Sequence, residues 1–211
     1  MRIVRRMPTI HLTFDDGPAD STEDILDALA EHDAKATFFQ VGRNVAARPE
    51  LTRRTHAEGH AVGNHSWSHP NLRSEVDDAG VLRELSDTSD ELERATGVRP
   101  ALFRPPYGQP WGRDDGNDAS ERRRLVQSHA ASLGMTVLLW HVDTNDWNED
   151  ERTSAEIAAD VIAAARPGAV ILLHDIWPRT AAAVPLILRE LHAQGYRFEQ
   201  VPAGTTLLPS R

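Results

Sequence analysis

A repeated change of hydrophobic period most restricts the fold of this 211-residue chain. Short apolar runs, typical of strands, alternate with longer segments whose apolar residues recur every three or four positions, as in amphipathic helices. The expected strands are 9–14, 36–42, 61–64, 101–104, 135–142, 168–174 and 196–202. The expected helices are 21–33, 49–59, 75–97, 121–134, 153–165 and 180–195.

Six or seven such units in about 200 residues predict an α/β fold with parallel strands and outer helices. An open doubly wound sheet and a closed barrel both fit this pattern. Ser21 or Thr22 is expected to cap the first helix, and Gly97 to end the third. No linker-like or low-complexity stretch divides the chain, so we expect residues 1–211 to form a single domain.

Composition excludes several classes of function. The formal net charge is -9, without a basic stripe, which argues against a nucleic-acid partner. There are no cysteines, so a metal site must use His, Asp and Glu. No apolar run approaches the ~20 residues that span a membrane, so we expect no membrane insertion.

For the cellular location, the sequence leaves two alternatives. No signal peptide is recognisable, which predicts a cytoplasmic protein, or a secreted one if the numbering starts at a trimmed end. We expect a monomer.

Chemically distinctive segments follow the predicted strands. They are "TFDDGP" (13–18), "NHSWSHP" (64–70), "FRPPYG" (103–108), "DTNDW" (143–147) and "LLHD" (172–175). The carboxyl ends of the strands in a β/α fold lie on one face, where active sites are built. The sequence therefore predicts one site assembled from all five segments.

Two of these segments together suggest a metal site. In an extended segment His65 and His69 would lie ~13 Å apart, whereas one helical turn puts them on the same face. The adjacent carboxylates of Asp15 and Asp16 repel each other unless a cation divides them. One Asp with two His gives three ligands and an open fourth position, as in catalytic zinc sites.

The spare Asp is then a candidate base, and His174 a candidate general acid. Such an acid needs a carboxylate neighbour to keep its proton near neutrality, and Asp146 is the candidate. Each motif alone has an ordinary structural explanation: a DDG turn, surface histidines, an Arg104 salt bridge, or core packing for Trp140 and Trp147. Their common position at strand ends favours the functional interpretation.

Taken together and in this order, the five segments resemble the polysaccharide deacetylases of carbohydrate esterase family 4, the NodB-homology domain. The resemblance runs from about Thr9 to about Pro202. It implies a distorted (β/α)₇ barrel and metal-dependent removal of acetyl groups from carbohydrates.

The resemblance also implies roles for particular residues. Asp16, His65 and His69 would be the metal ligands and Asp15 the catalytic base. Arg104 would orient the base, the backbone amide of Tyr107 would stabilise the oxyanion, and Asp146 would tune the acid His174. The implied substrate-binding residues are Pro105, Tyr107, Trp147 and Leu172.

Zinc suits this ligand set, and Co²⁺ or Ni²⁺ could occupy it as well. The leading hypothesis is a hydrolase that deacetylates N-acetylglucosamine-containing oligomers, such as chitin oligosaccharides or peptidoglycan. A second hypothesis is an intracellular amidohydrolase of a small N-acetylated metabolite. A third, a catalytically silent carbohydrate-binding module, predicts loss of the base or the acid, yet Asp15 and His174 are both present.

Overall fold

The structure is a computed structural model that describes residues 7–111, 117–148 and 152–208. Within these residues the strands are β1 (Thr9–Asp15), β2 (Thr37–Gln40), β3 (Ala61–Asn64), β4 (Leu102–Phe103), β5 (Thr136–Val137), β6 (Val142–Asp143), β7 (Val170–His174) and β8 (Arg197–Phe198). The helices are α1 (Asp20–Glu31), α2 (Gly42–Ala47), α3 (Pro49–Ala57), α4 (Asp78–Thr96), α5 (Asn117–Ser132), α6 (Ser154–Ala164) and α7 (Pro178–Ala193), with a short 3-10 helix, η1 (Pro106–Gly108).

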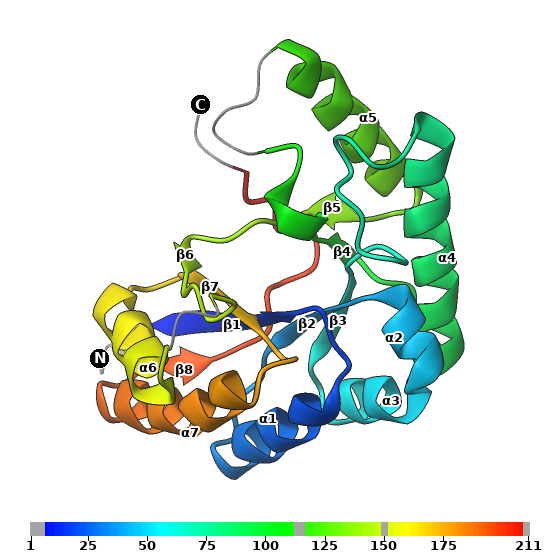
Figure 1. The fold of residues 1–211 in the computed structure, drawn as a ribbon. Coiled ribbons are helices and arrows are strands. Elements are labelled where there is room, and N and C mark those ends of the chain that lie inside the picture. Colours follow the sequence, from blue (N-terminus) through cyan, green and yellow to red (C-terminus); the bar gives the residue numbers. More distant parts are fainter. Residues whose placement is uncertain (1–6, 112–116, 149–151, 209–211) are drawn as a thin grey trace, which may run out of the picture.

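The strands form one parallel sheet in the order β5-β4-β3-β2-β1-β7-β6, and β8 pairs only with the first residues of β1. Figure 1 shows this sheet curled, with helices around its outside. Among the described residues no strand pairing joins β5 to β6, so the curl stays open there. This arrangement confirms the α/β class and the distorted barrel.

The alternation of side chains along β1 explains how the sheet separates core from site. Leu12 and Phe14 point outward and are buried in the main hydrophobic core with α1, α6 and α7. Thr13 and Asp15 point into the barrel, where both bind Arg104. Successive residues of a strand face opposite sides, so one strand contributes to the core and to the site.

Three details of the sequence-based prediction were wrong. Residues 135–142 form no continuous strand but split into β5 and β6, and Leu138 between them pairs with Leu207. The strand expected over 196–202 is reduced to the two residues of β8, which pair with the start of β1. The residue that caps α1 is Ala19, and Thr22 instead accepts a hydrogen bond from the Ala19 backbone N–H, at 2.8 Å.

Several helix boundaries also differ from the prediction. α5 spans Asn117–Ser132, so it begins four residues before the expected start at residue 121. α4 starts at Asp78 rather than at residue 75, and Asp77 caps it. Gly97 ends α4 in the left-handed conformation, with φ of 80°, as predicted. Across the described residues, no helix is both long enough and apolar enough to cross a membrane.

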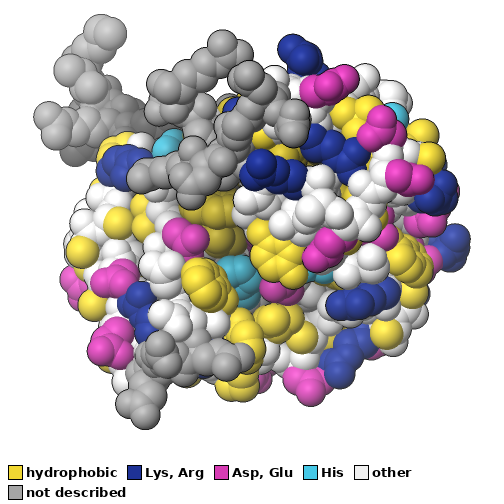
Figure 2. All heavy atoms as spheres, turned by 45° about the horizontal axis from the view of Figure 1, so that its top comes forward, with side chains coloured by type: hydrophobic (Ala, Val, Ile, Leu, Met, Phe, Trp, Pro, Cys, Tyr) yellow, Lys and Arg dark blue, Asp and Glu magenta, His cyan; other side chains and the backbone are white. Residues whose placement is uncertain are grey.

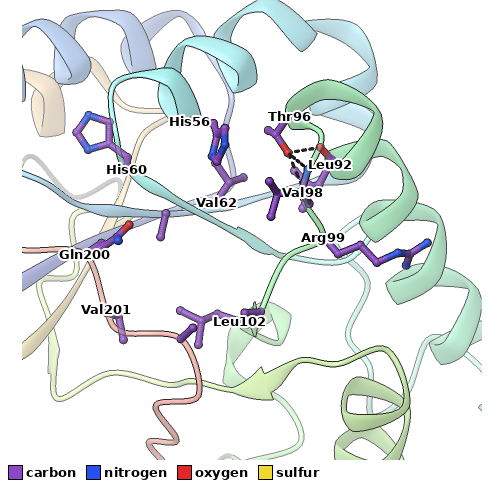
Figure 3. A pocket seen from close by; sticks show the side chains of 13 residues that line it. His56, His60, Val62, Leu92, Thr96, Val98, Arg99, Leu102, Gln200 and Val201 are labelled. Carbon is purple, nitrogen blue, oxygen red and sulfur yellow. Dashed lines mark hydrogen bonds between the residues drawn. The ribbon is translucent and has the colours of Figure 1, made fainter.

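A hollow at the amino ends of β3 and β4 shows none of the chemistry of the predicted site. Its lining residues, all within the described part of the chain, include no carboxylate. Figure 3 shows apolar side chains such as Val62 and Leu102 around it, while Arg99 points away toward α4. Burial lowers the pKa of the neighbouring His60 to about 4, so this imidazole is neutral. This hollow therefore lacks the paired carboxylates of the predicted site.

Candidate active site

The strand register brings the distinctive segments together at the carboxyl ends of the strands. Asp15, the last residue of β1, is paired with His174, the last residue of β7. Asn64 at the end of β3 is paired with Phe103 of β4, which places His65 beside Arg104. The predicted meeting of these segments is thus a direct consequence of the parallel pairing.

A pocket of about 370 Å³ opens at this end of the barrel. Its lining residues are Asp15, Asp16, His65, His69, Pro105, Tyr107, Trp140, Asp143, Trp147, Leu172 and His174. Figure 2 shows one face of the molecule, where histidine, acidic and hydrophobic side chains gather around a hollow. Of the predicted site residues only Arg104 and Asp146 do not line the pocket, and both are completely buried behind it.

Three side chains converge as a potential metal site. Asp16 Oδ1 lies 3.3 Å from His65 Nε2 and 3.1 Å from His69 Nε2. One ligand atom from each residue lies within 4.8 Å of the others. Within the described part of the chain, this is the single group of three or more His, Asp or Glu residues so arranged.

The donor set fits a metal ion. Ligand atoms about 2.0–2.1 Å from a tetrahedral zinc lie about 3.3 Å from one another, close to the separations found here. Asp16 Oδ1 is buried but makes no hydrogen bond, although two imidazole nitrogens are near it. Burial alone would raise the pKa of Asp16, but His65 and His69 outweigh it and hold the pKa well below its usual range.

The two histidines are presented by a loop, not by the helical turn that their spacing suggested. Residues 65–70 form no helix, and Ser66 and His69 have left-handed φ values of 63° and 61°. These conformations still bring the ring centroids of His65 and His69 within 4.9 Å. His65 Nδ1 donates to the Arg104 carbonyl oxygen at 2.7 Å, which leaves Nε2 to face Asp16.

Asp15 is held by a different partner. Arg104 Nη1 donates to Asp15 Oδ1 at 2.8 Å and to Thr13 Oγ1 at the same distance. The other guanidinium nitrogens donate to the carbonyl oxygens of Leu138 and Leu139, at 3.1 Å and 3.0 Å. The guanidinium thus links β1 to the segment that follows β5 and fixes one carboxylate oxygen of Asp15. The second oxygen, Oδ2, lies 3.8 Å from His65 Nε2.

His174 and Asp146 form a hydrogen-bonded pair on the other side of the pocket. His174 Nδ1 donates to Asp146 Oδ1 at 2.7 Å, and the His174 backbone N–H donates to Asp146 Oδ2 at 2.8 Å. Thr180 Oγ1 donates to the same Oδ2, and Arg179 Nε to the Asp146 carbonyl oxygen, both at 2.7 Å. Burial disfavours protonated His174, but Asp146 outweighs it and raises the pKa of His174 to about 9.

The pocket walls are largely apolar, as the predicted substrate-binding residues are. Tyr107 is 64% exposed and Trp147 49% exposed, so both rings stand at the rim, while Leu172 is buried. Tyr107 has a left-handed φ of 58°, and its ring packs edge-on against His69 with centroids 4.6 Å apart. Pro105 completes this part of the lining.

Two lining residues were not among the predicted site residues. Trp140, for which core packing was the ordinary explanation, lines the pocket, and its ring centroid lies 5.7 Å from Arg104 Cζ. Asp143 also lines the pocket, and its position in "DTNDW" could have indicated this. In the loop that follows η1, Trp111 is buried in the core beside α4 and α5, and residues 113–115 lie outside the described residues.

Comparison with known proteins is consistent with this site. Residues 4–137 match the family model of polysaccharide deacetylases. A peptidoglycan-N-acetylglucosamine deacetylase of Bacillus cereus is 40% identical over 194 residues, which are 90% of this chain and 67% of that protein. A chitooligosaccharide deacetylase of Rhizobium leguminosarum bv. trifolii is 36% identical over 208 residues, covering 92% of this chain and 90% of that protein.

A solved structure shows that the likeness extends to the fold. The peptidoglycan deacetylase PdaC of Bacillus subtilis superimposes with a TM-score of 0.79 at 40% identity, over 93% of this chain and 89% of that structure. The match spans only 38% of the full-length PdaC, which is named as a peptidoglycan-N-acetylmuramic acid deacetylase. With the curled parallel sheet and the site at its carboxyl ends, these matches show that the chain belongs to the polysaccharide deacetylase family.

Proposed function

We propose that this chain is a metal-dependent deacetylase that hydrolyses the N-acetyl groups of N-acetylglucosamine-containing oligosaccharides or polysaccharides and releases acetate. The observation that carries the proposal is that two adjacent carboxylates have different partners. Asp16 faces two histidines, whereas Asp15 is held by a buried arginine. An ordinary turn gives no reason for neighbouring aspartates to have such different partners.

Asp16, His65 and His69 would hold the metal ion, and zinc suits this set of one carboxylate and two imidazoles. Co²⁺ and Ni²⁺ accept the same ligands, and availability decides among them as much as affinity does. When bound, the ion supplies Lewis acidity, which polarises the acetyl carbonyl and makes water more acidic.

The chain's own residues supply the proton transfers. Asp15 takes a proton from the attacking water, while Arg104 holds the carboxylate in place. The water oxygen bonds to the acetyl carbon, and the Tyr107 backbone N–H donates to the oxyanion. His174, whose Nδ1 is bound to Asp146, uses its other nitrogen to protonate the leaving amine as the C–N bond breaks. The products are acetate and a free amino sugar.

The walls and rim of the pocket support a sugar substrate. Trp147 and Leu172 are apolar surfaces suited to the methyl of an acetyl group, and a cavity of about 370 Å³ is at the small end of ligand sites. The exposed rings of Tyr107 and Trp147 give flat apolar surfaces at the rim, where sugar units beyond the cavity could stack. This feature and the substrates named for the relatives favour an oligomer over a small metabolite.

A substrate panel tests the proposal. Acetate release is measured on N-acetylglucosamine oligomers of increasing length, on peptidoglycan fragments and on small N-acetylated metabolites. We expect kcat/KM to rise from the monomer to the longer oligomers. Release from the small metabolites alone would assign the chain to the metabolite amidohydrolases. A catalytically silent sugar-binding module would bind the oligomers without releasing acetate from any of them.

A metal titration of Asp16→Ala tests the ligand assignment separately. The variant should lose tight binding of Zn²⁺, with Asp24→Ala, an exposed aspartate on α1, as its control. Unchanged zinc affinity in Asp16→Ala would show that the ligands lie elsewhere.

A further inference from the structure

The loop that carries the two histidine ligands has a backbone conformation that its residue types disfavour. Between His65 and His69 the backbone turns through two residues with positive φ, Ser66 and His69, although neither is glycine. A side chain with a Cβ disfavours this conformation, so other contacts must compensate. Two of them form within the segment: the Ser66 N–H donates to Asn64 Oδ1 at 2.8 Å, and the His69 N–H donates to Ser66 Oγ at 3.1 Å.

One side chain on a neighbouring helix accepts three hydrogen bonds from this loop, while the backbone N–H groups of Gly42 and Arg43 donate to the Ser66 and Trp67 carbonyl oxygens. Glu84 of α4 accepts hydrogen bonds at its Oε2 from the backbone N–H groups of Trp67 and Ser68, each at 2.8 Å. Its Oε1 accepts the Ser68 hydroxyl, also at 2.8 Å. Both carboxylate oxygens are therefore bound to the segment between the two histidines.

The helix itself is firmly placed. Leu85, the next residue of α4, is completely buried in the core that α4 shares with α5 and β5. Its carbonyl oxygen accepts a hydrogen bond at 2.8 Å from Asn64, the last residue before the histidine loop. Glu84 thus connects the loop to a part of the fold that is already anchored on both sides.

We propose that Glu84 is a positioning residue that keeps His65 and His69 in the arrangement that binds the metal. This inference rests on the metal site of the proposed function and adds a residue that is not among those lining the substrate pocket. A carboxylate suits the role because it only accepts hydrogen bonds and has two oxygens for three donors. Glutamine has the same length but only one acceptor oxygen and no charge, so the loop loses its charge-assisted acceptor, and the NH₂ group fits only if the Ser68 hydroxyl turns to accept from it.

Zinc affinity is the direct test, measured by competition with a chromogenic chelator on wild type, Glu84→Gln and Asp87→Asn. Asp87 is an exposed residue of the same helix, so its variant loses the same charge without touching the loop. We expect Glu84→Gln to bind Zn²⁺ about 10- to 100-fold more weakly, the range seen when groups that orient ligands are removed. Asp87→Asn should match wild type.

A milder variant keeps the test valid if Glu84→Gln folds poorly. Ser68→Ala removes one of the three donors and leaves the carboxylate in place, so its zinc affinity should fall less than that of Glu84→Gln but measurably. Zinc affinities of folded Glu84→Gln and Ser68→Ala equal to wild type would overturn the inference. An equal loss in Asp87→Asn would overturn it too, because charge alone would then be the cause. If wild type itself bound no zinc, the proposed function would fail rather than this inference.

Discussion

The pair formed by His174 and Asp146 leads to a quantitative prediction for Asp146→Asn. Burial disfavours the protonated imidazole, and the hydrogen bond and charge of Asp146 reverse this, so that the pKa of His174 rises to about 9. Asparagine keeps the shape of the side chain but removes the charge. The burial remains, so the pKa should return to about 6.5, the ordinary value for histidine, or below. This fall in pKa means that protonated His174 loses about 3 kcal/mol of stabilisation relative to neutral His174.

The sign of the effect follows from the role of His174 as an acid. The protonated form is the active one, so activity is lost as the pH rises through the pKa of His174. In wild type the basic limb of kcat/KM should therefore lie near pH 9. In Asp146→Asn it should move to about pH 6.5 or lower, and at pH 7.5 only about a tenth of His174 would carry its proton.

The assay is acetate release from an N-acetylglucosamine oligomer across the pH range, with zinc in excess. Asp143→Asn is the matched control, because Asp143 lines the same pocket but is not bonded to His174. Its basic limb should stay near that of wild type. If the limb of Asp146→Asn stays near pH 9, or if Asp143→Asn shifts it equally, Asp146 does not set the pKa of the acid.

Three further substitutions test other parts of the account. Asp15→Asn should lower kcat by about 10²- to 10⁴-fold, as loss of a general base does, with zinc affinity near that of wild type; full turnover would mean that the base is another group. Arg104→Met leaves the buried Asp15 without its partner, so urea denaturation should show a loss of roughly 3–5 kcal/mol in the free energy of unfolding; a loss under about 1 kcal/mol would argue against a charged pair. Gly17→Ala places a Cβ 2.1 Å from a carboxylate oxygen of the buried Asp175, so the variant should be less stable by roughly 1–3 kcal/mol. An unchanged melting temperature in Gly17→Ala would show that Asp175 can move aside freely.

Elements with a strong local pattern could be predicted from the sequence. The alternation of residues 9–14 predicted β1, and the apolar run 168–174 predicted β7. Thr153 was recognisable as a cap and accepts a hydrogen bond from the Glu156 backbone N–H at 3.2 Å. Each distinctive segment could be seen to follow a predicted strand in the sequence. Because the strands are parallel, their carboxyl ends lie on one face, so the meeting of these segments could be predicted.

Features that depend on distant contacts could not be predicted in this way. The run 135–142 is mostly apolar, yet the carbonyl oxygens of Leu138 and Leu139 accept hydrogen bonds from Arg104, and the strand breaks there. Nothing local marks the left-handed conformation of Ser66 and His69, since both are ordinary residues with a Cβ. The four-residue spacing of His65 and His69 correctly predicted that their side chains lie together. The backbone between them, however, is a loop and not the expected helical turn.

Residues that hold others in place were the hardest to find. Glu84 has the sequence context of any charged residue on an exposed helix face, and its partners are 16 and 17 residues away. Thr180 lies 34 residues from Asp146, at the start of α7, where it reads as an ordinary helix-initiating residue. Their roles depend on how the helices dock against the strand ends, which hydrophobic periodicity does not specify.

The most direct test of the central claim is acetate release from N-acetylglucosamine oligomers before chelation, after chelation and after zinc is restored. If the chain is a metal-dependent deacetylase with Asp16, His65 and His69 as ligands, chelation should abolish release and added Zn²⁺ should restore it. Asp16→Ala should not be restored at the same zinc concentration. Release that continues after complete removal of the metal, or no release from the zinc-loaded wild type, would contradict the account.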